Sequence, residues 1–332
     1  MTSSRRQPDW PPATGIGSLP GADPVAGLRQ VFDALPDGPY SPELPERGPG
    51  ADMIGRGAGL LLDLPVDLQP SGWRFVARPG MDLRRTRDFW ARDLDALAQE
   101  AGDYRGWFKL QIAGPWTLAA NVELHRGDKA VADRGAARDI AESLAAGLVE
   151  YLAAVGRAMP YADLVVQLDE PSLPAVVRGA VQTSSGFGNL EAIEEPVVEA
   201  ALRMVLAAAG EAPTVVHCCA AEVPIELIRR TGPTALSLDL NLTFDQDELG
   251  VAIEAGTGLL LGVVPSTDSR LPVPRETADR VRDWWRRLGF DPQKLPGAAT
   301  LTPTCGLAEA SPGYAMACMT HLQAAGRELA AG

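Results

Sequence analysis

Short apolar runs alternate along this chain with longer segments of helical periodicity. The apolar runs are rich in Val, Ile and Leu and have the length of buried strands; they cover residues 13–18, 107–112, 164–169, 214–219, 234–240, 258–264 and 298–305. Amphipathic segments between them predict helices over residues 84–102, 131–158, 196–209, 245–255 and 312–330. Gly210 and Gly256 follow two of these helices, as is typical of a helix C-terminus. The pattern indicates repeated βα units around a parallel sheet.

The seven runs need one more strand to complete a barrel. We expect it within residues 40–64, where Pro and Gly obscure the periodicity. No linker or break in composition divides the chain, so the sequence predicts a single (β/α)8 TIM barrel over residues 13–332, after a flexible lead-in at residues 1–12. A doubly wound open sheet is the alternative. Against it, Gly15-Ile16-Gly17-Ser18 is too short for the GxGxxG fingerprint.

One apolar run ends in a His-x-Cys pair, in a chain with only three His and four Cys among 332 residues. Residues at i and i+2 of a strand share a face, so His217 and Cys219 should lie side by side while Cys218 points the other way. Imidazole and thiolate are ligands that zinc prefers. The alternative is a buried core cysteine beside a hydrogen-bonded histidine.

Other polar residues fall at the same ends of the predicted strands. In a barrel these ends form one cleft, which is where active sites lie. The residues concerned are Ser18, Gln111, Trp116, Asp169, Glu170, His217, Cys219, Asp239, Ser266, Asp268 and Cys305. Among them, His217, Cys219, Asp239 and Cys305 have the ligand types of a tetrahedral zinc site.

The order of the motifs resembles a known family. Ile16-Gly17-Ser18, Gly114-Pro115-Trp116-Thr117-Leu118, Gln167-Leu168-Asp169-Glu170-Pro171, the His217-Cys219 pair and Cys305-Gly306 follow one another. In this order they are similar to the catalytic C-terminal barrel of cobalamin-independent methionine synthase, in the superfamily that also holds uroporphyrinogen decarboxylase. The resemblance extends over nearly the whole chain, and it implies a methyltransferase of methionine biosynthesis.

The resemblance also implies roles for individual residues. Zinc would be held by His217, Cys219, Asp239 and Cys305, with Asp239 standing where the family usually has Glu. The turn Ile16-Gly17-Ser18 would bind the carboxylate of homocysteine, and Asp169 its ammonium group. Trp116 and Glu170 are further expected substrate-binding residues. The structural alternatives are an N-cap or solvated charge for Asp169, packing for Trp116 and a surface charge for Glu170.

Two thiolates and one carboxylate would outweigh the charge of zinc, leaving the site near −1. Such an electron-rich site keeps a bound sulfur nucleophilic, whereas a site of neutral imidazoles suits water activation. We therefore expect homocysteine to attack a methyl donor as a zinc-bound thiolate. Alternatives are another small thiol such as coenzyme M, or a non-catalytic barrel that binds structural zinc or an amino acid.

Two departures from the family pattern bear on the methyl donor. The N-terminal barrel of the full synthase is missing from this sequence, and residues 262–270 lack the His that the family uses to protonate the leaving folate. Thr267 stands at the nearest position, and Asp268 could act as a catalytic acid only with a raised pKa. These departures favour a donor that needs no proton, such as a methyl-corrinoid protein, over 5-methyltetrahydrofolate.

Composition restricts the partners and the cellular location that we expect for this protein. The net charge of −13 argues against nucleic acid and anionic membrane surfaces as partners. No apolar run has the length of a membrane span or of a secretory signal, so we expect a cytoplasmic protein. Four Cys without a framework spacing favour metal binding or catalysis over disulfides.

Overall fold

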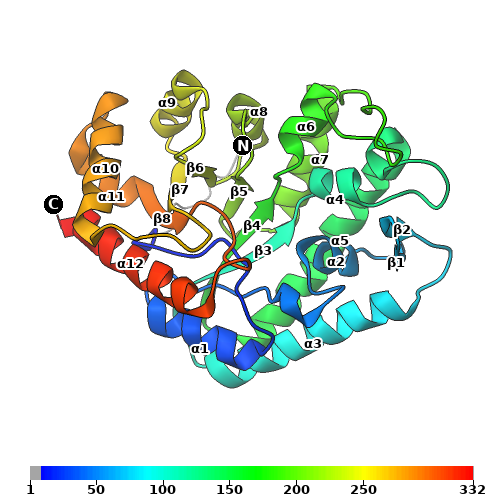
Figure 1. Ribbon diagram of the computed structural model, residues 1–332, viewed down its shortest axis with the longest axis horizontal. Coiled ribbons are helices and arrows are strands. Elements are labelled where there is room, and N and C mark those ends of the chain that lie inside the picture. Colours follow the sequence, from blue (N-terminus) through cyan, green and yellow to red (C-terminus); the bar gives the residue numbers. More distant parts are fainter. Residues whose placement is uncertain (1–8, 332) are drawn as a thin grey trace.

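A parallel sheet lies at the centre of the computed structural model, which describes residues 9–331 (Figure 1). Its strands occur in the order β3-β4-β5-β6-β7-β8, and each neighbouring pair is parallel. Their bounds are β3 Gly106–Ala113, β4 Ala162–Asp169, β5 Thr214–Cys218, β6 Ala235–Asp239, β7 Gly258–Val264 and β8 Ala299–Pro303. These are the last six of the strands expected from the sequence.

Two short segments close the sheet into a barrel. A parallel bridge joins Ala13 to Leu301 of β8, and another joins Tyr40 to Lys109 of β3. Between the two segments, Ser18 bridges Glu43, with the Glu43 N–H donating to the Gly17 carbonyl at 3.0 Å. Residues 13–18 and 40–43 are thus the first two barrel strands, and the (β/α)8 barrel is confirmed. The strand expected within residues 40–64 lies at the start of that interval.

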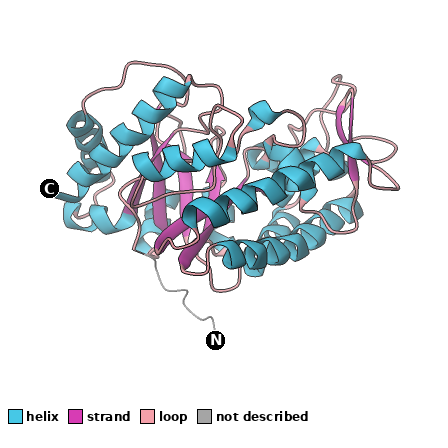
Figure 2. Cartoon of the chain, turned by 90° about the horizontal axis from the view of Figure 1, so that it is seen from below, coloured by secondary structure: helices cyan, strands magenta, loops and turns pink. Residues whose placement is uncertain are grey.

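Helices form the outer layer of the molecule (Figures 1 and 2). They are α1 Pro24–Ala34, α2 Met53–Gly59, α3 Met81–Ala101, α4 Pro115–Asn121, α5 Arg134–Ala158, α6 Leu173–Arg178, α7 Glu195–Ala208, α8 Ile225–Thr231, α9 Gln246–Glu254, α10 Pro274–Arg287, α11 Leu295–Ala298 and α12 Pro312–Ala331, with 3-10 turns at Pro45–Arg47, Ala130–Ala132 and Pro292–Lys294. Five of them match the predicted helices to within a few residues. Among residues 9–331, none is long and apolar enough to span a membrane.

One sheet lies outside the barrel. Strands β1 (Val66–Gln69) and β2 (Gly72–Phe75) form an antiparallel hairpin that the sequence analysis did not predict, and Figure 2 shows it apart from the barrel strands. Phe75 N–H donates to the carbonyl of Glu123, which anchors the hairpin to the loop after α4. The hairpin therefore extends the helical layer and leaves the barrel order unchanged.

An apolar cluster closes the end of the barrel at which the parallel strands begin. Trp10 is buried there, and the cluster consists of Trp10, Trp107, Val165, Val215, Ala235 and Leu260. The carbonyls of Pro11 and Pro12 accept hydrogen bonds from Thr300 and Leu301 of β8. Residues 9–12 are thus packed against the barrel, which corrects the expected flexible lead-in; residues 1–8 lie outside the described part of the chain.

The inside of the barrel is polar toward the C-terminal ends of the strands. Side chains two positions after four members of the apolar cluster share their strand faces, and they are buried and polar: Lys109, Gln167, His217 and Ser237. The opposite faces carry apolar residues such as Leu168 and Val216, which belong to the main core under the helices. Polar groups are therefore collected toward one end of the barrel, where the strands end.

Candidate metal and substrate site

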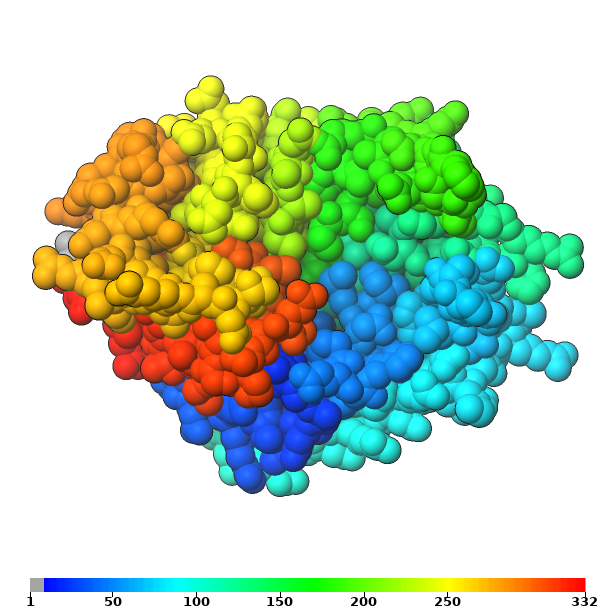
Figure 3. Space-filling view, viewed as in Figure 1, coloured from blue at the N-terminus to red at the C-terminus, as the bar shows by residue number. Residues whose placement is uncertain are grey.

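A cavity of about 410 Å³ lies at the C-terminal ends of the strands. Its walls come from the turn at residues 16–18, from segments around Glu43 and Met53, and from the loops after β4, β5, β7 and β8. The lining residues are Ile16, Gly17, Ser18, Glu43, Pro45, Ala51, Asp52, Met53, Asp169, Pro171, His217, Cys219, Ser266, Thr267, Cys305, Gly306, Ala308 and Glu309. Blue, green and orange segments meet at the centre of the face in Figure 3, as these walls require.

Three of the expected metal ligands meet in this cavity. His217 lies on β5, Cys219 directly follows that strand, and Cys305 follows β8. One ligand atom from each lies within 4.8 Å of the others, and the two sulfur atoms are 3.4 Å apart. The sequence spacing explains half of this arrangement, since residues 217 and 219 share a strand face; barrel closure brings in Cys305.

The histidine is oriented as a metal ligand would be. Its Nδ1 lies 2.9 Å from the hydroxyl oxygen of Ser237, whereas its buried Nε2 has no hydrogen-bond partner in the described structure. A metal-binding His ordinarily has one ring nitrogen free for the metal and the other held by a hydrogen bond. The unsatisfied Nε2, beside two thiols, therefore fits a thiophilic ion such as zinc. Ser237 was not predicted from the sequence, although it shares the inner face of β6 with Asp239.

The two cysteines differ in their tendency to ionise. The contact with Cys219, followed by the influence of His217, lowers the pKa of the Cys305 thiol. The hydrogen bond to Cys305, together with burial, raises the pKa of Cys219. Cys305 is therefore the sulfur that ionises first in the metal-free pair. A thiolate already favoured at neutral pH is a ready metal ligand.

Asp239 lies at the end of β6 but outside this cluster. Its Oδ1 accepts hydrogen bonds from the Asn241 backbone at 2.8 Å and from the Asn241 side chain at 2.9 Å. Burial raises its pKa, and Cys305 adds to that effect. Asp239 therefore lies near the expected ligands, but its carboxylate is engaged in hydrogen bonds with Asn241.

The turn at residues 16–18 is held by its carbonyl groups. The Ile16 carbonyl accepts from Lys109 at 2.8 Å and from Gln167 at 3.0 Å, and the Ser18 carbonyl accepts from the Leu307 N–H at 2.8 Å. Gly17 is also required sterically, because a Cβ there would lie 2.9 Å from Gln111. These hydrogen bonds fix the peptide planes of the turn, and all three of its residues line the cavity.

Two buried carboxylates face the same space. Asp169, at the end of β4, accepts a hydrogen bond from Gln167 at 2.7 Å. Burial raises its pKa to about 6, with His217 and Lys109 opposing that shift. Glu43 is the second carboxylate; burial raises its pKa to about 7, with Arg56 the first opposing influence. Glu43 was not predicted from the sequence, because the position of its strand within residues 40–64 could not be predicted.

Trp116, Glu170 and Asp268 are not among the lining residues of the described cavity. Trp116 is buried and donates its indole N–H to the Val198 carbonyl at 3.1 Å. Glu170 accepts from the Trp116 and Thr117 N–H groups, fixing the start of α4. Asp268 is exposed, and hydrogen bonds from Ser311 lower its pKa. The geometry gives the first two residues structural contacts, and it deprives Asp268 of the raised pKa that a general acid needs.

Lys109 is a further residue that sequence analysis missed. Burial lowers the pKa of its ammonium group to about 7, against the opposing influence of Asp169 and Glu43. Its neighbours are the Ile16 carbonyl, already described, and Gln111 Oε1 at 3.3 Å. The sequence did contain a signal for this residue, because Lys109 is a charged residue within a mostly apolar predicted strand and shares a strand face with Trp107 and Gln111.

The closed parallel barrel and the polar cavity at its strand ends define an α/β-barrel enzyme architecture. The family described as "Cobalamin-independent synthase, Catalytic domain" matches residues 10–328, and the chain belongs to this family. Membership places it among methyltransferases of the methionine synthase type, which act on homocysteine. The resemblance expected from the motifs is confirmed.

Solved structures agree with this architecture. A B12-independent methionine synthase from Shewanella sp. W3-18-1, solved with selenomethionine, has a TM-score of 0.64 at 14% identity, covering 96% of this chain and 97% of that one. At that identity the likeness shows the fold. A GH10 xylanase from Thermobacillus composti has a TM-score of only 0.35 at 13% identity, covering 89% of this chain and 85% of that one. A search of curated proteins finds no match.

Proposed function

We propose that this protein transfers a methyl group to the thiol of homocysteine and so forms methionine. The observation that carries the proposal is the position of the His217, Cys219 and Cys305 cluster in the same cavity as two buried carboxylates. A thiol-binding centre beside groups that attract an ammonium ion suits a substrate with both functions. Coenzyme M has no amino group and would leave those carboxylates unpaired. We propose the single barrel, residues 13–332, as the catalytic unit.

Zinc is the metal that the donor set favours. His217, Cys219 and Cys305 would hold it, and we propose Asp239 as a fourth ligand if its bonds to Asn241 are released. Bound there, zinc would keep a substrate thiol deprotonated and nucleophilic at neutral pH. The Ser237 hydroxyl would fix the imidazole for this role.

The amino-acid end of the substrate would lie on the opposite wall. We assign the carboxylate to the turn of Ile16, Gly17 and Ser18, and the ammonium group to Asp169 together with Glu43. The turn has its carbonyls fixed by the protein, so its amide groups are available to an anion. The structural neighbour's complex with selenomethionine supports a cavity that takes the product amino acid.

The lining of the cavity and the family description bear on the methyl donor. In the transfer, the substrate sulfur forms a bond to the methyl carbon while the donor keeps the electron pair of its broken bond. The cavity lining contains four carboxylates and no Lys or Arg, which disfavours a polyanionic folate, and Asp268 is unsuited to protonate one. The family's description as cobalamin-independent weighs against a methyl-corrinoid protein. Both donors therefore belong in the test.

The proposed function is tested by parallel assays of methionine formation. Homocysteine is incubated with zinc-loaded protein and methylcobalamin, monoglutamyl 5-methyltetrahydrofolate or its triglutamyl form. The missing acid near Thr267 and the lack of cations in the cavity lining argue for the corrinoid in the opposite direction to the family description, and on these two features we expect it to be the best of the three. Clear preference for a folate would overturn that argument about the donor, and absence of methionine with every donor would overturn the proposed reaction.

The binding of methionine should weaken as the pH falls. Glu43 and Asp169 would bind the ammonium group in their ionised forms, and their raised pKa values, about 7 and about 6, place protonation at neutrality for Glu43 and one pH unit lower for Asp169. Lys109 opposes both shifts and Arg56 opposes that of Glu43, whereas the charge of Asp169 adds to the rise at Glu43. We expect affinity to level off toward about pH 8 and to fall through pH 7 and pH 6, approaching about tenfold per pH unit for each group titrated. Calorimetry between about pH 5.5 and about pH 8 measures this, and a flat profile would contradict the assignment.

A further inference from the structure

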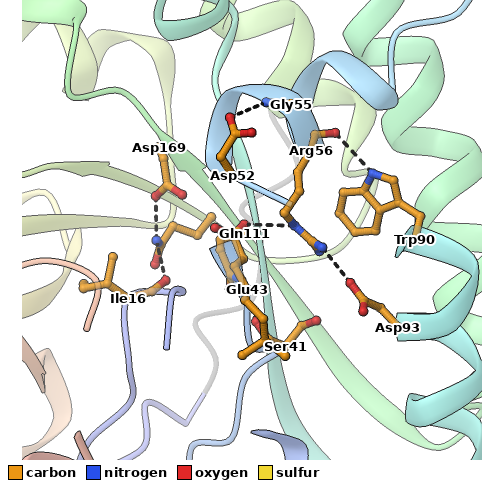
Figure 4. Close-up of polar contacts among 12 residues, drawn as sticks. Ile16, Ser41, Glu43, Asp52, Gly55, Arg56, Trp90, Asp93, Gln111 and Asp169 are labelled. Atoms are coloured by element: carbon orange, nitrogen blue, oxygen red, sulfur yellow. Dashed lines mark hydrogen bonds and ion pairs between the residues drawn. The ribbon is translucent and has the colours of Figure 1, made fainter. Parts of the chain in front are cut away.

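We propose that Arg56 is a positioning residue, which holds the Glu43 carboxylate ionised and directed at the amino group of the substrate. This inference rests on the proposed function, because it assigns Glu43 to an amino-acid substrate. Arg56 itself does not line the cavity. It lies behind Glu43, between the barrel and α3 (Figure 4).

Asp93 and Trp90 hold the guanidinium group in place. Its Nη1 donates to Asp93 Oδ2 at 2.6 Å, and its carbon lies 3.8 Å from the centre of the Trp90 ring. The Trp90 indole N–H in turn donates to the Arg56 carbonyl at 3.2 Å. Only 2% of the Arg56 surface is exposed, so solvent does not screen the charge. This arrangement leaves one edge of the guanidinium for the cavity side.

That remaining edge points at Glu43. Arg56 Nε is buried, has no hydrogen-bond partner in the described structure, and lies 3.6 Å from Glu43 Oε1. The backbone of Glu43 is held by the bond from its N–H to Gly17 and by the bond from the Leu19 N–H to its carbonyl. The fixed backbone of Glu43 and the fixed guanidinium group of Arg56 together restrict the orientation of the Glu43 carboxylate.

The charges around Arg56 explain why it serves Glu43 in particular. Asp93 already has a second cation, since Arg47 donates to both of its oxygens at 2.6 and 3.1 Å. Glu43 has no such second ion pair in the described structure, and the other buried cation near it, Lys109, donates to Ile16 and Gln111. Loss of Arg56 would therefore leave Asp93 paired and Glu43 without its ion-pair partner.

A buried carboxylate without a counter-charge tends to become protonated. A protonated Glu43 would no longer attract an ammonium group, although the rest of the cavity would be intact. Arg56 therefore affects how well the site distinguishes an amino acid from the same molecule without its amino group. A residue that only stabilises the fold would weaken both ligands alike.

The test compares the binding of L-methionine and of 4-(methylthio)butanoate, which lacks the amino group. Calorimetry is done at about pH 8, where wild-type Glu43 is mostly ionised, on full-length, zinc-loaded wild type, Arg56→Met and Arg56→Lys, with zinc content measured for each. We expect wild type to favour methionine at least tenfold, Arg56→Met to lose most of that preference, and Arg56→Lys to keep part of it. In the methyl-transfer assay, Arg56→Met should raise KM for homocysteine about tenfold and change kcat by less than about threefold.

Arg47→Met is the matched control. It removes the other cation on Asp93 and leaves the contact between Arg56 and Glu43, so it should retain the wild-type preference. If folded Arg56→Met keeps the full preference for methionine over 4-(methylthio)butanoate, the role of Arg56 is overturned. If Arg56→Met does not fold, the role is overturned when Arg56→Lys keeps the full preference and Arg47→Met loses it. If the wild-type protein does not bind methionine, the proposed function itself is contradicted. The wild-type measurement tests this independently of the Arg56 variants.

Discussion

Replacement of Cys305 by serine is expected to lower zinc affinity more than about 100-fold and to abolish methyl transfer. Cys305 supplies one of only three ligand atoms in the described cluster, and it is the sulfur whose pKa is lowered by its neighbours. Loss of an outer-shell partner alone typically costs 10–100-fold in metal affinity, so loss of a direct thiolate ligand should cost more. Cys219→Ser should behave similarly. Zinc per chain after dialysis against a weak chelator measures the effect.

Cys218→Ser is the control for that experiment. Cys218 adjoins Cys219 in the sequence, but it is fully buried in the core on the opposite strand face, and burial raises its pKa to about 12. We expect this variant to retain zinc, with some loss of stability. Equal zinc contents in Cys305→Ser and wild type would contradict the proposed metal site.

Asp169→Asn is expected to lower kcat/KM for homocysteine at least roughly thirtyfold. The substitution keeps the shape of the side chain and an oxygen for the bond from Gln167, but it removes the negative charge that we assign to the substrate ammonium group. Loss of one partner from a buried charged pair typically costs about 2–5 kcal/mol. Initial rates over a range of homocysteine concentrations give the change.

The comparison substrate for Asp169→Asn is 4-mercaptobutanoate, which has the thiol and the carboxylate but no amino group. Wild type should use it poorly, and the variant should use it about as well as wild type does. An equal loss with both substrates would show that Asp169 acts on the fold or on the metal site, and would remove its assignment to the ammonium group.

The sequence predicted those features that local periodicity determines. Strand alternation placed His217 and Cys219 on one face, and the barrel pattern placed Cys305 beside them, as the structure shows. The apolar runs at β3 to β8 were long enough to be recognised. Residues 40–43 were not, because this strand is held by isolated bridges and surrounded by prolines, so Glu43 at its end was also missed.

Side-chain direction at loop positions could not be predicted from the sequence. Glu170 follows Asp169 directly, yet it turns to the start of α4 while Asp169 faces the cavity. Asp239 is at the expected strand end, but a local turn with Asn241 takes its carboxylate. Arg56 resembles any helical arginine in the sequence, and only the packing of α2 against α3 places it behind Glu43.

The most direct test of a catalytic metal centre is X-ray absorption of the zinc-loaded protein before and after addition of homocysteine. If the cluster of His217, Cys219 and Cys305 receives the substrate thiol, the number of sulfur neighbours around zinc should rise from two to three. An unchanged sulfur count at saturating homocysteine would show a structural zinc site and contradict the account.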